Sequence, residues 1–267
     1  MMNETDDDGA GDDGLEICRE TYGGDVAVRV ACRTSFRGTL LDGEVDRTGL
    51  MQWPARVAVS EWLCAARSTL KGKRLVELGC GAGGCGAVAA ALGLDVLATD
   101  ASPEALALAA RNLAANAAPG ARYDVARHVW GDGWGALGPR DVAYAADVVY
   151  PATPPSAVDA LFASARAAVG ASGVFVLGFV VRGARLPERL FAAAAGCGAR
   201  VLDGAAAAAP CGATVFEFAF AGGGDLEACA RRPYPGIWAP ERDDGDAPSS
   251  DDEWMPFAGE AAADALW

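Results

Sequence analysis

The chain has 267 residues, of which 52% are hydrophobic and 22% charged, enough apolar material for one large α/β domain. Its formal net charge of −14 resides at the two ends: residues 1–16 carry seven acidic and no basic side chains, and residues 222–267 carry eleven acidic and three basic ones. Bulk nucleic-acid binding needs many basic contacts to phosphate, so we expect the chain not to bind bulk nucleic acid.

Other classes are excluded as easily. The acidic start of the chain has no apolar segment, so we expect neither a secretory signal nor a transit peptide. The longest apolar run, residues 174–181, is far shorter than the ~20 residues that span a membrane, so we expect no membrane contact. Eight cysteines without a CxxC pair and a single histidine predict reduced thiols, no metal site, and a cytoplasmic or nuclear location.

In chain order, residues 1–14 are rich in Asp and Gly and predict a disordered acidic tail. Residues 25–32 alternate as a strand does, and we expect residues 38–41 to be their hairpin partner. Pro54 is placed to begin a helix with apolar side chains behind it. We therefore assign residues 15–70 to a small N-terminal β/helix extension.

From residue 71 strand and helix patterns alternate. Repeated βα units predict a parallel sheet with right-handed crossovers and helices on both faces. Residues 71–221 are thus expected to form the doubly wound, Rossmann-like α/β core of a domain that spans residues 15–221. The expected strands are residues 74–78, 95–99, 125–130, 142–149, 173–180, 201 and 213–220, and the expected helices are residues 85–92, 103–116, 158–169 and 187–195.

The last segment, residues 222–267, is acidic, rich in Gly and Pro, and predicted to be a disordered tail. Isolated aromatic side chains among its acids, such as Trp238 beside Arg231 and Arg232, can order on a partner, so we expect this tail to be where a partner docks. No heptad pattern is evident, and a monomer is expected.

The clearest motif is a glycine turn that starts at Glu77, directly after an expected strand. Glycine permits positive φ and close approach of the backbone to a ligand, and the N–H groups at the next helix start attract an anion. Asp100 ends the following strand, where an acid accepts ribose hydroxyls. Gly79-x-Gly81-x-x-Gly84 with Asp100 would by itself also fit a nicotinamide dinucleotide.

Glu77 separates these two ligands. A dinucleotide presents a pyrophosphate to the turn, which a carboxylate would repel. S-adenosylmethionine has no phosphate and carries an ammonium, a carboxylate and a cationic sulfonium. An acid near the turn suits those cations, and the helix N-terminus suits the carboxylate. The sequence therefore predicts S-adenosylmethionine as cofactor and S-adenosylhomocysteine as its product.

Further motifs occur in register with this turn and together resemble a known family. They are Ala98-Thr-Asp100, Asn112-Leu-Ala-Ala-Asn116, Gln52-Trp-Pro-Ala55, Trp130-Gly-Asp132 and Ala146-Asp-Val-Val-Tyr150. Together they resemble the class I, seven-strand methyltransferases, and in particular the methyltransferase-like family of non-histone protein-lysine methyltransferases. The resemblance runs from about Gly49 to Arg182, and it implies the seven-strand methyltransferase sheet.

The resemblance also implies a cofactor pocket. The glycine turn would wrap the methionine portion, Asp100 would take the ribose, and Trp130 would lie against the adenine, whose amino group Asp132 could reach. Trp53 would cover the cofactor, and Ala146 would contact it. The implied cofactor-binding residues are Trp53, Glu77, Gly79, Cys80, Gly81, Gly83, Asp100, Trp130 and Ala146.

Asp147-x-x-Tyr150 is the candidate acceptor site. Methyl transfer needs alignment and a neutral amine, whereas a lysine at its ordinary pKa of ~10.4 is mostly protonated. Asp147 could hold the incoming ammonium, and Tyr150 could orient it by cation–π contact or hydrogen bonding. In the resembling family this stretch serves the acceptor. Asp147 and Tyr150 are therefore the expected catalytic residues.

The leading hypothesis is thus an S-adenosylmethionine-dependent protein N-methyltransferase that acts on a lysine of a non-histone protein. The same fold could instead methylate a histidine, an arginine, a protein N-terminus or a small amine. A catalytically idle binding module that acts through the C-terminal tail is the alternative from another class. His128, the single histidine, is interpreted as a structural residue and not as a base.

Overall fold

The computed structural model describes residues 14–34, 48–183, 185–202, 207–208 and 212–220. Apart from Gly14, the expected tails at residues 1–14 and 222–267 lie outside these ranges, as does the expected strand at residues 38–41. The strands are β1 (Glu16–Tyr22), β2 (Val26–Cys32), β3 (Arg74–Leu78), β4 (Asp95–Asp100), β5 (Arg122–Arg127), β6 (Val142–Ala146), β7 (Val174–Phe179), β8 (Arg200–Val201), β9 (Ala207–Ala208) and β10 (Thr214–Ala219). The helices are α1 (Ala55–Ala65), α2 (Arg67–Leu70), α3 (Gly84–Ala91), α4 (Pro103–Asn116), α5 (Pro155–Val169) and α6 (Leu186–Gly196), with short turns η1 (Thr48–Leu50) and η2 (Gly135–Leu137).

The central sheet confirms the doubly wound α/β prediction. Its strand order is β5-β4-β3-β6-β7-β10-β8, with β9 paired to β10. Strands β3 to β7 are parallel, as the βα units require. Strand β10 runs antiparallel to β7 and separates it from β8. The sequence predicted β10 as a strand but neither its direction nor its place in the sheet.

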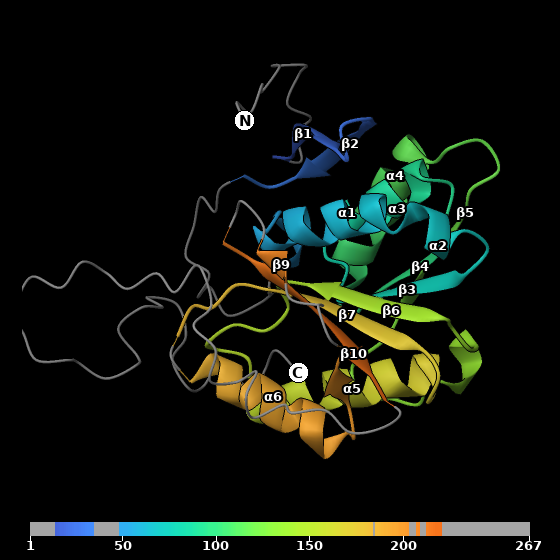
Figure 1. Ribbon diagram of the computed structural model, residues 1–267. Coiled ribbons are helices and arrows are strands. Elements are labelled where there is room, and N and C mark those ends of the chain that lie inside the picture. Colours follow the sequence, from blue (N-terminus) through green and yellow to red (C-terminus); the bar gives the residue numbers. More distant parts are fainter. Residues whose placement is uncertain (1–13, 35–47, 184, 203–206, 209–211, 221–267) are drawn as a thin grey trace, which may run out of the picture.

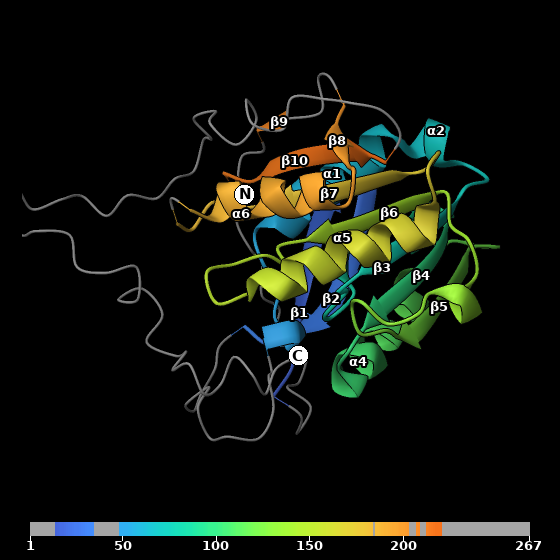
Figure 2. The same ribbon diagram turned by 90° about the horizontal axis from the view of Figure 1, so that it is seen from below.

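Helices cover both faces of this sheet, with α1 to α4 on one side and α5 and α6 on the other (Figures 1 and 2). The second face packs around aromatic rings: Phe162 of α5 makes edge contacts with Phe175 and Phe218, at 5.4 and 5.1 Å between ring centroids. Each of these buried side chains contributes roughly 1.5–3 kcal/mol to folding through the apolar area it buries. This core fixes the strand ends from which the site is built.

The N-terminal extension is a hairpin whose strands differ from those expected. The hairpin partner that the structure shows for β2 is β1, which precedes it, in antiparallel register from Glu16 opposite Cys32 to Tyr22 opposite Val26. Gly23 and Gly24, both with positive φ, make the turn. The hairpin lies against α3 and α4 because Asn112 bonds to both the N–H and the C=O of Ala31.

Two strand ends also differ from the expectation, and both shape the site. Strand β5 ends at Arg127, so His128 and Trp130 lie beyond it and not on it. Strand β6 ends at Ala146 because Asp147 has a φ of +60°, the left-handed conformation, which cannot continue a strand. The helix expected to begin at Pro54 is observed as α1, and the short helix α2 follows it.

Candidate functional site

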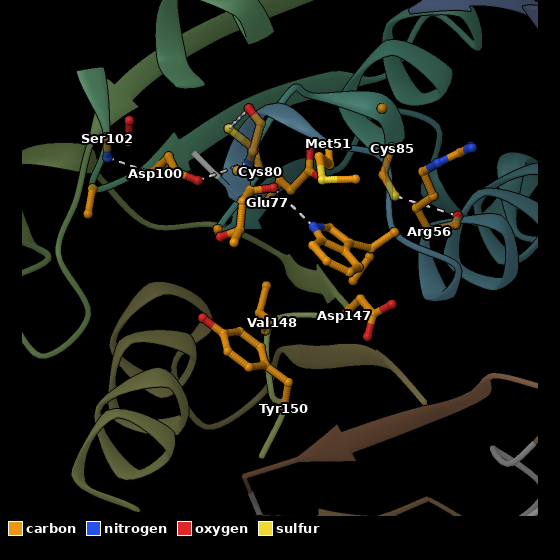
Figure 3. A pocket seen from close by; sticks show the side chains of 18 of the residues that line it. Met51, Arg56, Glu77, Cys80, Cys85, Asp100, Ser102, Asp147, Val148 and Tyr150 are labelled. Atoms are coloured by element: carbon orange, nitrogen blue, oxygen red, sulfur yellow. Dashed lines mark hydrogen bonds between the residues drawn. The ribbon is translucent and has the colours of Figure 1, made fainter. Parts of the chain in front are cut away.

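A cavity of about 580 Å³ opens where β3, β4 and β6 end. Parallel α/β sheets bind ligands at the carboxyl ends of their strands, and this volume lies within the roughly 300–1,000 Å³ of small-molecule sites. Glu77, Cys80 and Asp100 line one side, and Asp147, Val148 and Tyr150 line the other (Figure 3). Eight of the nine residues expected to bind the cofactor line it, as do both expected catalytic residues.

Gly79, the first glycine of the turn, lies too close to its neighbours to carry a side chain. The N–H groups of Gly79 and Cys80 both donate to Thr99 O at 2.9 Å. A Cβ on Gly79 would lie 2.9 Å from Val148 and 3.1 Å from Trp130. The turn is therefore fixed to β4 on one side and lies against Val148 and Trp130 on the other.

Gly83 is the expected cofactor residue that does not line the cavity. Its φ is +76°, and a Cβ there would lie 2.9 Å from the backbone of Ala109 and about as close to the Ala109 side chain. Gly83 therefore permits α3 to pack closely on α4. The cavity lining therefore gives no support to the expected contact of Gly83 with the cofactor, because the spacing of glycines does not show which of them faces a ligand and which faces a helix.

Asp100 lies where the sequence expected it, at the end of β4 and in the cavity. Its Oδ2 accepts the N–H of Gly81 and its Oδ1 the N–H of Ser102, both at 2.9 Å (Figure 3). These two bonds hold the carboxylate beside the glycine turn. This is the arrangement in which an acid can bind the ribose hydroxyls of an adenosyl group.

Glu77 is almost completely buried, at 2% exposure, and its carboxylate accepts hydrogen bonds from the Gly86 N–H and the Tyr144 hydroxyl. Burial nevertheless dominates and raises the pKa of Glu77 to about 8. Without a ligand, the acid therefore holds its proton at neutral pH. A cation bound beside Glu77 would favour the ionised carboxylate. S-adenosylmethionine carries such positive charges on its ammonium and its sulfonium.

Gln52 lines the same cavity and was not expected to bind the cofactor, although its motif was noted. Its Oε1 is buried and has no hydrogen-bond partner among the residues that the structure describes. A Cβ on Gly84, the first residue of α3, would lie 2.3 Å from this oxygen. A buried amide without a partner at a helix N-terminus fits a ligand with both an ammonium and a carboxylate, as the methionine portion of S-adenosylmethionine has.

The two expected tryptophans, Trp53 and Trp130, both line the cavity. Trp130 packs over Gly79, and Trp53 precedes α1, is 37% exposed, and donates from Nε1 to Thr48 O at 3.0 Å. Asp132, in contrast, is exposed and does not line the cavity. His128 lines the cavity as well; it is buried, bonds to Ser164 Oγ at 3.1 Å, and has a pKa lowered by burial.

Asp147 differs from the expectation. Its carboxylate is not free to bind an ammonium, because both oxygens are bound by Arg182, with Nη2 at 2.7 Å from Oδ2. The Oδ2 atom also accepts the N–H of Ala55, the first residue of α1, at 3.2 Å. Sequence reasoning missed Arg182, since no local pattern distinguishes an arginine that follows a strand from one on the surface.

Tyr150 lies on the far side of Val148 from Asp147, and its hydroxyl points away from that residue (Figure 3). Its main chain is held by Thr153, which accepts the Tyr150 N–H at 3.0 Å and donates its own N–H to Tyr150 O at 2.9 Å. Arg189 of α6 binds the carbonyl of Thr153 in turn. The segment from Asp147 to Thr153 is therefore fixed from both ends.

Arg56 of α1 connects the cavity to the N-terminal hairpin. It lines the cavity, and its guanidinium binds the carboxylate of Glu20 and the hydroxyl of Tyr22, both on β1.

Burial raises the pKa of the Cys80 and Cys85 thiols, which also line the cavity, well above the ordinary value. A raised pKa favours the neutral thiol, which is the less reactive form of cysteine.

Comparison with known proteins decides the family. A family model described as "Lysine methyltransferase" matches residues 39–185, more than half of the chain. The chain belongs to the lysine methyltransferase family. The cofactor of this family and of its fold is S-adenosylmethionine, and the cavity has the glycine turn, the acid of β4 and the buried amide that suit it.

Two curated relatives are similar to this chain in sequence. Protein N-lysine methyltransferase METTL21A of Danio rerio is 37% identical over 102 residues, which are 37% of this chain and 46% of the relative. EEF1A lysine methyltransferase 3 of Mus musculus is 36% identical over 99 residues, which are 37% of this chain and 42% of the relative. The chain thus spans less than half the length of each relative.

Among solved structures, the glycopeptide N-methyltransferase MtfA has a similar fold. Its TM-score is 0.51 at 15% identity, and the match covers 61% of this chain and 89% of MtfA. Its complex with sinefungin also has a TM-score of 0.51, at 14% identity over 71% and 96% of the two chains. At this identity the likeness shows the fold alone.

Among the described residues, no helix is long and apolar enough to cross a membrane, and no group of three or more potential ligands could hold a metal.

Proposed function

We propose that this lysine methyltransferase transfers a methyl group from S-adenosylmethionine to the side-chain amine of a lysine in a non-histone protein. The observation that carries the proposal is the position of the Asp147–Tyr150 segment, which faces the glycine turn across one cavity. The names of the two curated relatives support the choice of lysine as the acceptor.

S-adenosylmethionine supplies an electrophilic methyl group on its sulfonium. The lone pair of the lysine nitrogen forms the new N–C bond as the C–S bond breaks, and S-adenosylhomocysteine leaves with the electron pair. The methylated ammonium then loses its surplus proton to water. Such a displacement depends on alignment and on exclusion of water more than on a strong base.

On the cofactor side, Gln52 and the start of α3 would bind the two charged groups of the methionine portion. Asp100 would bind the ribose, and Trp130 would lie against the adenine. Glu77 would become charged as the cations of the cofactor arrive and would then favour them. Cys80, Gly79 and Gly81 would contribute their backbone to the same surface, Trp53 would cover the cofactor, and Ala146 would contact it.

On the acceptor side, Tyr150 would orient the amine with its ring or hydroxyl. Asp147 would act in its pair with Arg182, which fixes the main chain at the end of β6. A small residue at Ala146 leaves room between these groups and the glycine turn. The chain would thus position the amine and methyl donor in line.

We further propose that the protein acts as a monomer in the cytoplasm or nucleus and that the C-terminal tail docks a partner. The location is supported by cysteines that are scattered along the chain without a CxxC pair, a pattern typical of reduced thiols. Such thiols persist in a reducing compartment.

Labelling tests the proposal. The purified protein is incubated with radiolabelled S-adenosylmethionine and a lysate of its source cells, beside Asp147→Asn and Asp159→Asn. Asp159 is exposed on α5 and does not line the cavity, so it provides the same change of charge away from the site. We expect a labelled protein band with the wild type and Asp159→Asn, strongly reduced in Asp147→Asn, with the label on lysine by mass spectrometry.

Other outcomes assign the chain differently. Label on histidine, arginine, a protein N-terminus or a small molecule would contradict lysine as the acceptor while retaining the methyltransferase. No label together with intact binding of S-adenosylmethionine would favour an idle binding module. No binding of the cofactor by calorimetry at micromolar protein would contradict the proposal altogether.

A further inference from the structure

Arg182 follows β7 and reaches back to Asp147, the first residue after β6. Its Nη1 binds Asp147 Oδ1, and its Nη2 donates to Oδ2 at 2.7 Å, so both carboxylate oxygens are engaged. The guanidinium also lies 5.9 Å from the centroid of the Trp53 ring. Arg182 therefore already contacts a carboxylate and an aromatic face, the two kinds of group that attract a substrate ammonium.

The pair is fixed from three elements. The Asp147 side chain has no exposed surface although the residue as a whole is 6% exposed, so only its main chain is accessible. Besides Arg182, the carboxylate binds the Ala55 N–H of α1, and the Asp147 N–H donates to Gly178 O of β7 at 2.9 Å. A buried carboxylate that loses its cation is strongly unfavourable. Asp147 and Arg182 therefore act as one neutral unit.

The charge of this unit matters for the acceptor. Lysine in water is mostly protonated below its ordinary pKa of ~10.4, whereas methyl transfer needs the unprotonated amine. A carboxylate without a counter-ion, close to the amine, stabilises the ammonium and opposes loss of its proton. A carboxylate that is paired with a guanidinium has a much weaker field, because the two opposite charges lie close together.

We propose that Arg182 is a positioning residue that keeps Asp147 charge-compensated, so that the acceptor lysine loses its proton nearer to neutral pH than it would beside an unpaired carboxylate. This inference rests on the proposed lysine methylation. Besides the neutral thiols of Cys80 and Cys85, the other titratable or charged side chains that line the cavity are Arg56, Glu77, Asp100, Arg127, His128 and Tyr150.

The test is the dependence of kcat on pH, measured with saturating S-adenosylmethionine and the substrate found by labelling. Wild type is compared with Arg182→Gln, Arg182→Lys and Arg166→Gln. Arg166 lies on α5, donates to Cys197 O at 2.8 Å, and does not line the cavity. In Arg182→Gln we expect the acidic limb of the profile to move to a pH about one unit higher. At a given pH below the limb, kcat is then about tenfold lower than in the wild type. Arg182→Lys and Arg166→Gln should keep the wild-type limb.

A double variant, Asp147→Asn with Arg182→Gln, removes both charges. It is expected to return the limb to its wild-type position, even at a lower maximal rate, because no uncompensated charge remains. Binding of S-adenosylmethionine by calorimetry shows which variants are folded. If Arg182→Gln does not fold, Asp147→Asn alone decides: it leaves the guanidinium uncompensated, which should move the limb to lower pH.

Three results would overturn the inference. One is a limb that does not move in Arg182→Gln or, where that variant is unfolded, in Asp147→Asn. Another is a uniform loss of activity at every pH, as a merely structural role predicts. The third is a lower KM of Arg182→Gln for the protein substrate with an unmoved limb, which would mean that the arginine occupies the place of the amine. No lysine methylation by the wild type would contradict the proposed function and this inference with it.

Discussion

Glu77 and Tyr144 lie opposite each other on β3 and β6, with the Tyr144 hydroxyl 3.4 Å from Glu77 Oε2. Both side chains are buried beneath the glycine turn. The pKa of Glu77 is raised to about 8, chiefly by burial, and the hydrogen bonds from Gly86 and Tyr144 offset only part of that effect. The floor of the cavity thus holds an acid that is neutral in the ligand-free protein and can become charged.

This acid should make stability depend on pH. The folded protein retains the proton of Glu77 up to about pH 8, whereas the unfolded chain loses it near the ordinary value of 4.5. The stabilising contribution is therefore complete below pH 4.5 and is lost as the pH rises to about 8. We expect the denaturation midpoint of the wild type to fall relative to Glu77→Gln across this window. The exposed Glu104→Gln should follow the wild type, and parallel curves for wild type and Glu77→Gln would contradict the burial argument.

The close approach at the glycine turn predicts a loss of cofactor binding in Gly79→Ala. Gly79 and Gly72 have similar positive φ values, +73° and +79°, but a Cβ on Gly72 meets nothing within 4 Å. Both variants should lose about 1–2 kcal/mol of stability from the backbone conformation. Only Gly79→Ala should also bind S-adenosylmethionine at least about tenfold more weakly in calorimetry, because Val148 and Trp130 must shift. Equal affinities in the two variants would show that the turn does not face the cofactor.

Two asparagines of α4 offer a matched pair for the docking of the hairpin. Asn112 is buried and bonds to the N–H and C=O of Ala31 and to the C=O of Ala82, at 2.8–2.9 Å. Asn116, one turn later and half-buried, makes the same two bonds to Arg29. Asn112→Ala should cost about 1–3 kcal/mol because it leaves buried backbone groups without partners. Asn116→Ala should lower the free energy of unfolding by less, since water can replace its hydrogen bonds. Chemical denaturation measures the loss in both variants. Equal losses would argue against burial as the reason for the difference.

Cys18 should be the most reactive of the cysteines that the structure describes. The hydrogen bond from the Cys32 thiol lowers the pKa of Cys18 to about 7, whereas Cys80 and Cys85 are buried with raised pKa values. Brief alkylation followed by peptide mapping should therefore modify Cys18 first, at a rate that rises through pH 7 and then levels. Cys32→Ala should slow this reaction at neutral pH, and Cys64→Ala should leave it unchanged. Faster labelling of Cys80 would contradict the geometry of the turn.

The sequence by itself determined the α/β core and the location of the cavity, because both depend on local patterns. Strand β3 and helix α4 have the expected bounds, since a short apolar run before a glycine turn and a Ser102–Pro103 helix start are signals within a few residues. The positions of Glu77 and Asp100 were predicted from equally local signals, because each residue ends or nearly ends a strand. Parallel strands bring their carboxyl ends together at one edge, so residues recognised separately were expected to meet.

Only the tertiary structure decided which neighbours these residues have. It gave β2 its partner β1, placed β10 antiparallel between β7 and β8, and turned Gly83 toward α4. It also joined Asp147 to Arg182 across 35 positions of sequence, because β6 pairs with β7 and their ends lie side by side. Hydrophobic periodicity shows that a segment is a strand, but the choice of the adjacent strand depends on packing of the whole sheet. The charge that the proposed acceptor would meet depends on that packing as well.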